Sequence, residues 1–394
     1  MKIKLRFLIL LSFFYISQNI AQVNLSVYSE ISIVTAGPGE KLYEKFGHSA
    51  IRIKDPVLNL DIIYNYGIFD FDKPNFLLNF AQGKMYYLLA RYDFLYFFNS
   101  YMKDKRWLKQ QVLNLSKLEK QQVFLYLENN ALKENATYLY DPFFNNCASK
   151  PKDILKEILQ ENVILNSKNI ENGKSLRDLM DKEIHWNTWG NFGINLIAGT
   201  ILDKERMQLE YTYLPDYLLE ISKNAKINRN GKLVDLVKRE DVLLDYKEKT
   251  NSFNIFNPIL IFLLLLSAVI YITFKDFKNN TRNRYLDFII FFITGFIGLI
   301  LTYLWLFSSH KTAPNNFNIL WAFLPNLIFS FFILKVKIKS WFHKYIIALL
   351  ALLLIVVVMW LFKFQIFPLT IIPLLILLFF RYLFLYKYLL TSKK

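Results

Sequence analysis

Residues 46–53 read FGHSAIRI and residues 60–66 read LDIIYNY, and these two stretches decide the fold expected for the first half of the chain. In the first stretch polar and apolar side chains alternate, which predicts a half-buried strand that carries His48 behind a glycine. The second stretch also suits a strand and follows a turn at 55–59. We therefore expect an antiparallel pair of strands that brings Asn65 back to the level of His48.

A second motif lies about a hundred residues further on. Residues 145–149 read NNCAS and precede a stretch with helical spacing, 152–159, and Pro151 suits the first turn of that helix. Cys147 thus lies at a predicted helix N-terminus, where unpaired N–H groups and the helix dipole favour a thiolate. A nearby imidazole, such as that of His48, would take the thiol proton and complete a nucleophile with its base. The alternative is a buried, unreactive thiol and a histidine that only forms hydrogen bonds.

The composition indicates a membrane protein. Of the 394 residues, 54% are hydrophobic, 17% aromatic and only 20% charged. The formal net charge is +16, and residues 254–394 contribute fourteen Lys and Arg against two acidic residues. Because this positive charge lies beside apolar runs, it indicates membrane orientation and argues against nucleic-acid binding. One cysteine excludes an internal disulfide and a CxxC site, and four dispersed histidines without an HExxH motif argue against a metal site.

The N-terminus is typical of a secretory signal. Residues 1–6 are basic, residues 7–16 are almost entirely apolar, and a polar stretch ends at Ala21. The apolar core is shorter than the ~20 residues that a membrane span needs. We expect a signal peptide at residues 1–21, with an uncleaved anchor as the alternative, and in both cases the segment that follows is exported.

Five apolar runs fill the C-terminal third of the chain, each near the length that crosses a bilayer. The loops at 275–284 and 335–344 and the tail from Arg381 are rich in Lys and Arg, whereas the loops between them carry little charge. The positive-inside rule therefore places these two loops and the C-terminus in the cytoplasm. Pro368 and Pro373 predict that the last helix is kinked or begins late. The expected spans are 258–274, 288–307, 317–334, 345–362 and 364–380.

These patterns predict a fold of the α+β class with two parts. Residues 22–253 form an exported domain with an antiparallel sheet and a packed helix that bears the cysteine. Residues 254–394 form an all-α bundle of about five transmembrane helices.

The motifs around His48 and Cys147 resemble those of the circularly permuted NlpC-like, papain-related hydrolases and acyltransferases, the group that includes lecithin:retinol acyltransferase. In that group a strand histidine precedes a cysteine at a helix N-terminus, the reverse of the order in papain. Further stretches make residues 25–390 similar to the Lnb family of lipoprotein N-acyltransferases. These stretches are PGEKLYEKFGHSAIRI (38–53), YNYGIFDF (64–71), NFAQGKMYYL (79–88), DPFFNNCAS (141–149), SLRDLM (175–180), WGNFGINLIAG (189–199), YLPDYL (213–218) and SSHKTAPNNFNILW (308–321).

The resemblance implies an enzyme of the bacterial inner membrane whose catalytic domain, papain-like in fold, lies in the periplasm. It would move a fatty acyl chain from a phospholipid to the α-amine of the diacylglyceryl-cysteine of a lipoprotein, without a cofactor. Cys147 would be the nucleophile, and His48 the base and then the acid. Asn65 or Asp70 would orient the imidazole, and the sequence does not choose between them. The implied partners are a phospholipid donor, a lipidated apolipoprotein acceptor and the membrane, with no nucleic acid.

Donors for the tetrahedral oxyanion and one arginine complete the expected ectodomain site. The backbone N–H of Cys147 would supply one donor, and Asn146 or Tyr66 are candidates for another. Arg177 could pair with a phosphate or with a structural carboxylate such as Asp203, and we favour the structural role.

Polar residues at the exported ends of two spans are further candidates. His310, Asn316 and Asn318 match the family's polar segment at this place and could bind a phosphate or ester headgroup, or they could simply mark the membrane edge. The match is weaker here, because Lys311 stands where a proline is expected and Ile319 where a leucine is expected.

Two other functions remain open from the sequence. The same cysteine and histidine could pass an acyl group to water, as in a phospholipase or a cell-wall amidase. Alternatively, the exported domain could be a non-catalytic, membrane-tethered binding module. The binding module predicts that Cys147→Ser leaves every phenotype intact.

Overall fold

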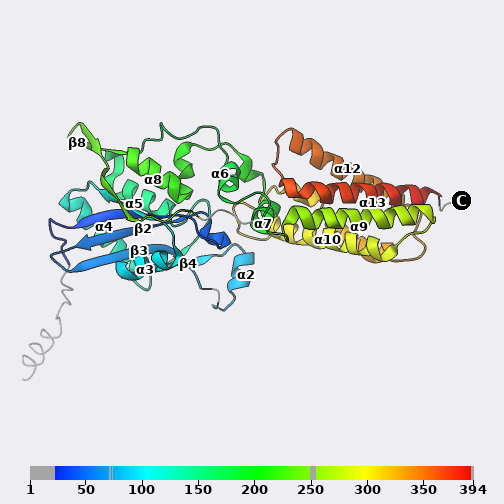
Figure 1. Ribbon diagram of the computed structural model, residues 1–394, viewed down its shortest axis with the longest axis horizontal. Helices are drawn as coiled ribbons and strands as arrows, with labels where there is room; N and C mark the ends of the chain where they lie inside the picture. Colours follow the sequence, from blue (N-terminus) through cyan, green and yellow to red (C-terminus); the bar gives the residue numbers. More distant parts are fainter. Residues whose placement is uncertain (1–22, 71, 73, 249–253, 392–394) are drawn as a thin grey trace, which may run out of the picture.

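The computed structural model describes residues 23–70, 72, 74–248 and 254–391. The signal peptide expected at 1–21 lies outside the described residues. Along its longest axis the molecule has a mixed sheet-and-helix domain at one end and a helical bundle at the other (Figure 1). This arrangement confirms the predicted α+β class, with an antiparallel sheet followed by apolar helices.

The N-terminal domain is built on a seven-stranded antiparallel sheet with the order β10-β5-β1-β2-β3-β4-β6. A second sheet of three strands has the order β7-β8-β9. The large sheet comprises β1 (Glu30–Ala36), β2 (His48–Asp55), β3 (Leu60–Ile68), β4 (Tyr86–Asp93), β5 (Leu108–Leu113), β6 (Thr137–Leu139) and β10 (Val237–Leu244). The small sheet comprises β7 (Val163–Ile164), β8 (Lys226–Arg229) and β9 (Lys232–Asp235).

The predicted strand pair is present as β2 and β3, in which Ile51 lies opposite Tyr64. Their ladder ends at this pair, although β2 continues back to His48 along its other neighbour, β1. On β3 a bulge follows, and Gly67 has a φ of +93°, which glycine adopts without strain. The two strands therefore diverge at the end where His48 and Asn65 lie.

Helices cover both faces of the large sheet (Figure 1). On the face of α4 and α5, Ile53, Tyr64 and Leu155 belong to one buried apolar core. On the face of α3, Ile63 and Phe97 belong to another. The helices are α2 (Phe76–Ala81), α3 (Phe94–Asp104), α4 (Lys117–Ala131), α5 (Ser149–Leu159), α6 (Leu176–Glu183), α7 (Trp189–Ile197) and α8 (Pro215–Asn224). The 3₁₀ turns are η1 (Leu42–Glu44), η2 (Gln160–Asn162), η3 (Thr200–Asp203) and η4 (Gln208–Tyr213).

The bundle contains four helical segments long and apolar enough to cross a membrane, and a shorter apolar segment. The short segment replaces the third predicted span, because its helix ends at Leu320 and resumes only at Pro325. A proline suits a first helical turn, where its missing N–H costs nothing. The elements are α9 (Pro258–Lys278), α10 (Arg284–Leu306), η5 (Phe317–Leu320), α11 (Pro325–Ile333), α12 (Phe342–Leu361), η6 (Leu369–Ile371) and α13 (Ile372–Thr391).

The short segment nevertheless runs from one end of the bundle to the other. Arg282, in the α9–α10 turn, donates to the backbone oxygens of Ile333 and Lys335 at 2.8 and 2.7 Å. At the opposite end, the backbone N–H of Phe317 donates to Oε1 of Gln365, between α12 and α13, at 2.8 Å. The five predicted apolar segments thus alternate in direction, and α13 ends at the bundle end that points away from the sheet (Figure 1).

The last helix begins late, as Pro368 and Pro373 predict, because a 3₁₀ turn comes between Pro368 and α13. Further along α13, Arg381 is fully buried and pairs with Asp276 and Asp287 at 2.8 and 2.6 Å. These ion pairs fix α13 against α9 and α10.

Candidate active site

The sheet end nearest the bundle carries the predicted histidine and its partner. His48 opens β2, and its Nε2 lies 2.6 Å from Oδ1 of Asn65 on β3. Asn65 in turn donates from Nδ2 to the hydroxyl of Tyr92 on β4 at 2.8 Å. Three neighbouring strands therefore hold the imidazole, and Nδ1 is the nitrogen left for the cysteine. Of the two orienting residues expected from the sequence, Asn65 makes the contact.

Cys147 lies where β2 and β3 diverge, directly before α5. A Cβ atom built on Gly67 would lie 3.7 Å from Cβ of Cys147, so β3 passes beside the thiol. The sulfur hydrogen-bonds to His48 and accepts the backbone N–H groups of Ser49 and of Cys147 itself. Ser49 lies on β2 beyond the last residue pair between β2 and β3, and its backbone N–H reaches the sulfur there. We refer to Cys147 and His48 as the dyad.

The charges of the dyad reinforce each other. Burial raises the pKa of the Cys147 thiol, but the charge and hydrogen bond of His48, together with two backbone N–H groups, outweigh burial and lower the pKa overall. Burial also lowers the pKa of His48, but Cys147 and the hydrogen bond to Asn65 outweigh it and raise the pKa. Each group therefore favours the charged form of the other, which is the direction that an activated cysteine nucleophile with a histidine partner requires.

Asn146 holds the loop that presents the cysteine. Its Oδ1 accepts the backbone N–H groups of Ala148 and Ser149 at 3.0 and 2.9 Å, as a cap of α5 does. Its Nδ2 donates to the backbone oxygens of Pro142 and Tyr213, both at 2.7 Å. Because both amide protons are used, the structure gives Asn146 a positioning role in place of the expected oxyanion role.

Tyr66 and Asp70 lie apart from the dyad. The Tyr66 hydroxyl accepts a hydrogen bond from Asn130 at 3.0 Å, and its ring packs in the core on the α4–α5 face. Asp70 is exposed and accepts the backbone N–H of Asp72 at 2.9 Å. In the described part of the chain neither side chain hydrogen-bonds to the dyad, so neither fills the role expected for it.

Arg177 is held by protein groups, which supports the structural role that the sequence favours. It is 1% exposed, its Nε donates to Oδ1 of Asp203 at 2.6 Å, and its Nη1 donates to Oδ1 of Asn195. Its Nη2 donates to the backbone oxygen of Gly199 at 3.0 Å. The guanidinium is thus occupied by protein groups, and a phosphate has no access to it.

Asn316 and Asn318 join the bundle to the N-terminal domain. Asn316 donates from Nδ2 to the backbone oxygen of Leu196 in α7 at 2.8 Å. Asn318 donates from Nδ2 to the backbone oxygens of Asn195 and Leu196 at 3.3 and 3.2 Å. Both side chains are buried, so they act as a structural joint and cannot meet a headgroup as the sequence suggested.

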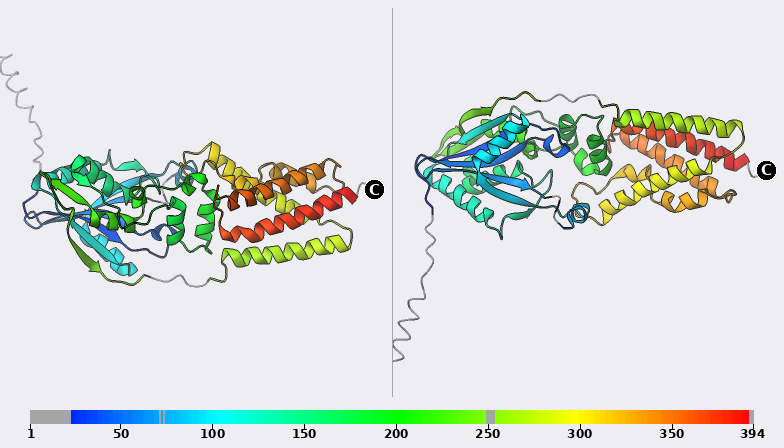
Figure 2. Two further views of the ribbon diagram at one scale, coloured as in Figure 1. Left: turned by 90° about the horizontal axis from the view of Figure 1, so that it is seen from above. Right: turned by 60° about the horizontal axis from the view of Figure 1, so that its bottom comes forward.

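His310 belongs to the same joint but contacts a different element. Its Nε2 lies 2.7 Å from the backbone oxygen of Phe80 in α2, and the N–H of Ser309 donates to the backbone oxygen of Gln82 at 2.8 Å. Figure 2 shows α2 beside the end of α10 from which this segment leaves. Unlike the two asparagines, His310 is partly exposed, so its headgroup role stays a prediction.

Two further residues near the dyad were not predicted from the sequence. Tyr92 supports the orienting asparagine, and the charge of Arg106 acts on His48. Arg106 comes close because Ala36 of β1 lies opposite both His48 and Leu108, which opens β5. Such closeness follows from the strand order, and the local sequence pattern carries no signal for it.

Within the described ranges, no group of three or more His, Cys, Asp or Glu side chains is placed to hold a metal ion.

Two protein-family models match the chain. The Lnb N-terminal periplasmic domain matches residues 18–180, and the Lnb transmembrane domain matches residues 248–394. No curated protein and no solved structure matches the chain. The two family models together cover more than half of the sequence and correspond to the sheet domain and the bundle. The chain therefore belongs to the Lnb family and is an inner-membrane protein with a periplasmic N-terminal domain.

Proposed function

We propose that the protein is a lipoprotein N-acyltransferase. It moves an acyl chain from a phospholipid to the α-amine of a lipoprotein's diacylglyceryl-cysteine, through a thioester on Cys147. The observation that carries this proposal is the Cys147–His48–Asn65 arrangement at the sheet end nearest the bundle. Membership of the Lnb family supports an enzyme at the membrane. The order of the strand histidine before the helix cysteine supports a papain-related, circularly permuted thiol site.

The first half-reaction forms the thioester. The Cys147 thiolate attacks the ester carbonyl carbon of the phospholipid and gives a tetrahedral oxyanion. When this intermediate collapses, the bond to the glycerol oxygen breaks and the His48 imidazolium gives its proton to that oxygen. The products are an acyl-enzyme and a lysophospholipid. The raised pKa of His48 suits this step, because the imidazole must still be protonated when the leaving oxygen takes a proton.

The second half-reaction forms the amide. The neutral α-amine of the lipoprotein attacks the thioester carbonyl carbon, and the now neutral His48 accepts a proton from the attacking nitrogen. The carbon–sulfur bond then breaks and the Cys147 thiolate returns beside the imidazolium. A thioester is aminolysed more readily than the parent ester, so the cysteine divides one difficult transfer into two easier steps.

Backbone donors beside the sulfur suit the oxyanion. The N–H groups of Ser49 and Cys147 already hydrogen-bond to the sulfur, and the oxyanion forms on the carbon that bonds to this sulfur. Donors fixed by the backbone stabilise developing charge without reorganisation, and one such donor is worth about 3–4 kcal/mol in other acyl-transfer enzymes. We infer that the N–H of Cys147 is one oxyanion donor, as the sequence suggested, and that the N–H of Ser49 takes the second place in preference to Asn146 or Tyr66.

An aromatic series connects the dyad with the bundle. The ring of Tyr140 and the thiol of Cys147 both lie beside Gly67. From Tyr140 onward, successive ring centroids are 4.4 to 6.4 Å apart. At the bundle end, α2 exposes Leu77 and Leu78, with 77% and 54% of their surfaces accessible. Apolar surface of this kind suits an acyl chain that leaves the bilayer. The series is Tyr140, Tyr87, Phe69, Phe76, Phe80 and His310.

We place the far end of the bundle in the cytoplasm. The α9–α10 turn and the α11–α12 turn are rich in Lys and Arg, and both lie at the end of the bundle away from the sheet. The positive-inside rule then puts the C-terminus in the cytoplasm as well. The dyad faces the outer surface of the membrane, where phospholipids and lipoproteins both present their polar ends.

The site and the aromatic series support the use of a lipid acyl donor over a cell-wall amidase or a binding module. A cell-wall amidase has no use for an aromatic series that leads to membrane helices. A binding module has no use for a buried thiolate–imidazolium pair. A phospholipase would use the same groups and differs only in passing the acyl chain to water, so the acceptor must be identified by experiment.

The test is intact-mass spectrometry of a lipoprotein's N-terminal peptide from cells that lack other N-acylating enzymes. The cells carry either the unaltered protein or Cys147→Ser, at equal levels in the membrane. We expect one added acyl chain on the α-amine with the unaltered protein and none with the variant. Addition by both would refute the nucleophile, and addition by neither would favour hydrolysis or binding.

A further inference from the structure

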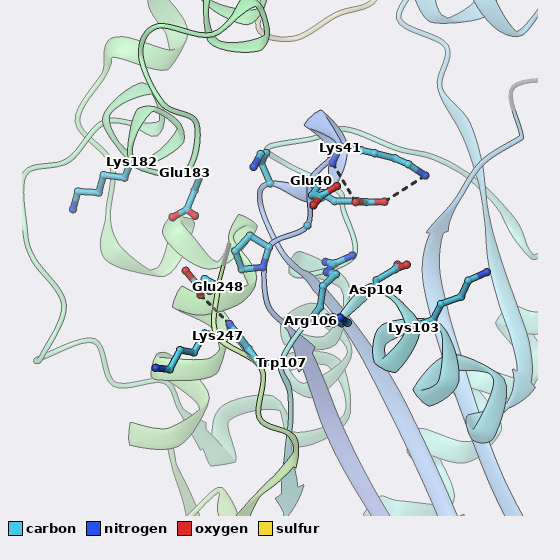
Figure 3. A pocket seen from close by; sticks show the side chains of 15 residues that line it. Glu40, Lys41, Lys103, Asp104, Arg106, Trp107, Lys182, Glu183, Lys247 and Glu248 are labelled. Carbon is cyan, nitrogen blue, oxygen red and sulfur yellow. Dashed lines mark hydrogen bonds and ion pairs between the residues drawn. The ribbon is translucent and has the colours of Figure 1, made fainter. Parts of the chain in front are cut away.

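A cavity of about 530 Å³ lies on the β5 side of β1, whereas His48 lies on the β2 side, and it has no role in the steps above. Its walls come from the β1–η1 loop, the α3–β5 turn, the end of α6 and residues 247–248 (Figure 3). Arg106 lines it, and its charge reaches His48 across β1. Arg106 therefore links this cavity electrostatically to the dyad.

Arg106, which lines this cavity, has one donor without a protein partner among the described residues. The side chain is 8% exposed, its Nε donates to the backbone oxygen of Gly37 at 2.8 Å, and its guanidinium carbon lies 4.7 Å from the Tyr101 ring centroid. Its Nη2 is buried and has no hydrogen-bond partner among the described residues. A buried charged N–H without an acceptor is costly, so this geometry suits an anionic ligand that supplies one.

The walls of the cavity carry more positive than negative charge. Seven Lys and Arg side chains line it against five acidic ones. Among the acids, burial and then the charges of Asp216 and Glu248 raise the pKa of Glu183 to about 7, which weakens its negative charge at neutral pH. Lys103 and Lys105, in the turn before Arg106, are exposed at the rim. The cationic residues are Lys41, Lys45, Lys103, Lys105, Arg106, Lys182 and Lys247.

We propose that this cavity binds the phosphate group of the donor phospholipid, with Arg106 as the buried donor and Lys103 and Lys105 at the rim. A guanidinium presents paired N–H groups that match phosphate oxygens. The inference rests on the proposed function, because it assigns the binding site for the phosphate group of the phospholipid substrate. The acceptor lipoprotein carries a diacylglyceryl group without phosphate, so the subsite distinguishes the two lipid substrates.

Direct binding tests this subsite without any acyl transfer. The full chain carrying Cys147→Ser is held in a phosphate-free amphipol and titrated calorimetrically with dihexanoylphosphatidylglycerol, with dihexanoylglycerol and with inorganic phosphate. We expect dihexanoylphosphatidylglycerol to bind at least about tenfold more tightly than dihexanoylglycerol, which corresponds to ~1.4 kcal/mol. Inorganic phosphate should bind weakly and compete. If it binds as tightly as the phospholipid, the site is for free anions and the assignment to a lipid is overturned.

Charge variants at the rim make the test specific. Lys103→Glu with Lys105→Glu should weaken phospholipid binding about tenfold and leave dihexanoylglycerol binding unchanged. The matched control is Lys117→Glu with Lys133→Glu, two exposed lysines on α4 and just after it, and it should not change either affinity. Arg106→Gln should weaken binding further, and the rim variants keep the test valid if that variant does not fold.

The outcome separates this inference from the proposed function. Equal affinity for the two dihexanoyl lipids, or unchanged affinity in the rim variants, overturns the subsite even if the unaltered protein acylates lipoproteins. Phospholipid binding that depends on the rim lysines supports the subsite even if no acyl transfer is detected.

Discussion

Two buried polar clusters lie at the end of the sheet domain nearest the bundle, and they differ in how completely their groups are paired. At the joint, which includes Arg177 because Arg177 and Asn318 both bind Asn195, these two side chains give donors to protein oxygens and are almost inaccessible. At the dyad, neighbours hold Cys147 and His48, the two groups favour each other's charged form, and Arg106 keeps a buried N–H without a partner among the described residues. Both clusters look polar in the sequence. We infer that the two clusters differ because the dyad region keeps polar groups that are not fully paired after folding, whereas the joint does not.

The largest effect should come from removing the sulfur. Cys147→Ala should lower the rate of acyl transfer by about 10⁴-fold or more, because no other group can form the thioester. Thermal unfolding of the purified protein should change little, since the thiol adds few packing contacts. Appreciable turnover by Cys147→Ala would show that another group is the nucleophile. The dyad would then not differ from the joint in reactivity.

The joint should respond in the opposite way. Arg177→Met leaves the carboxylate of Asp203 buried without its partner, and breaking such a pair costs about 3 kcal/mol. We expect a clear fall in the thermal unfolding midpoint, with normal activity per folded molecule. Arg239→Met, at an exposed ion pair with Glu30, is the matched control and should lower the midpoint far less. A catalytic defect in stably folded Arg177→Met would contradict the structural role.

The orienting asparagine should give an intermediate effect. Asn65→Ala removes the acceptor that holds Nε2 of His48, and kcat should fall about 10- to 100-fold with little change in KM. Asn65→Asp keeps an oxygen at this place and should recover part of the loss. Equal defects in both variants would show that the residue matters for packing and not for the imidazole.

The pH dependence of alkylation measures the charge of the dyad. The pKa of Cys147 is lowered, so iodoacetamide should react with the thiol at a lower pH than with an ordinary cysteine. In His48→Ala the burial that raises the pKa is no longer opposed by the imidazole, and the alkylation midpoint should move to higher pH. An unchanged alkylation midpoint in His48→Ala would mean that the imidazole does not stabilise the Cys147 thiolate.

The smallest effect is expected at Tyr66. Tyr66→Phe removes a hydroxyl that accepts one hydrogen bond from Asn130, which costs about 1 kcal/mol. Activity should stay normal, as measured by lipoprotein acylation beside the unaltered protein. A marked loss of activity without a loss of stability would restore Tyr66 as an oxyanion donor.

Local patterns predicted the parts of the site that lie on single elements. Alternation placed His48 and Asn65 on neighbouring strands, and helical spacing after Pro151 placed Cys147 at a helix start. The apolar runs and prolines predicted five segments and the late start of α13. The break between Leu320 and Pro325 was not predicted, because the mean hydropathy of a segment does not show where a helix ends.

Features that depend on long-range pairing could not be predicted. Arg106 reaches the dyad only because β5 and β2 flank the same strand. Asn316 and Asn318 look like headgroup ligands in the sequence, yet α7 supplies carbonyl oxygens that consume their donors. Asp70 lies close to Asn65 in the chain but follows the end of β3 and is exposed to solvent. In each case the partner comes from a distant part of the fold.

The central claim, a thioester on Cys147, is tested most directly by trapping the acyl-enzyme. The purified full chain is incubated with phospholipid in the absence of acceptor lipoprotein, and its intact mass is measured with and without hydroxylamine. The account predicts a mass increase of one acyl chain that hydroxylamine removes, that is absent in Cys147→Ala, and that disappears when acceptor is added. Efficient lipoprotein acylation by a chain that never carries such an adduct, or that carries it in Cys147→Ala, would contradict it.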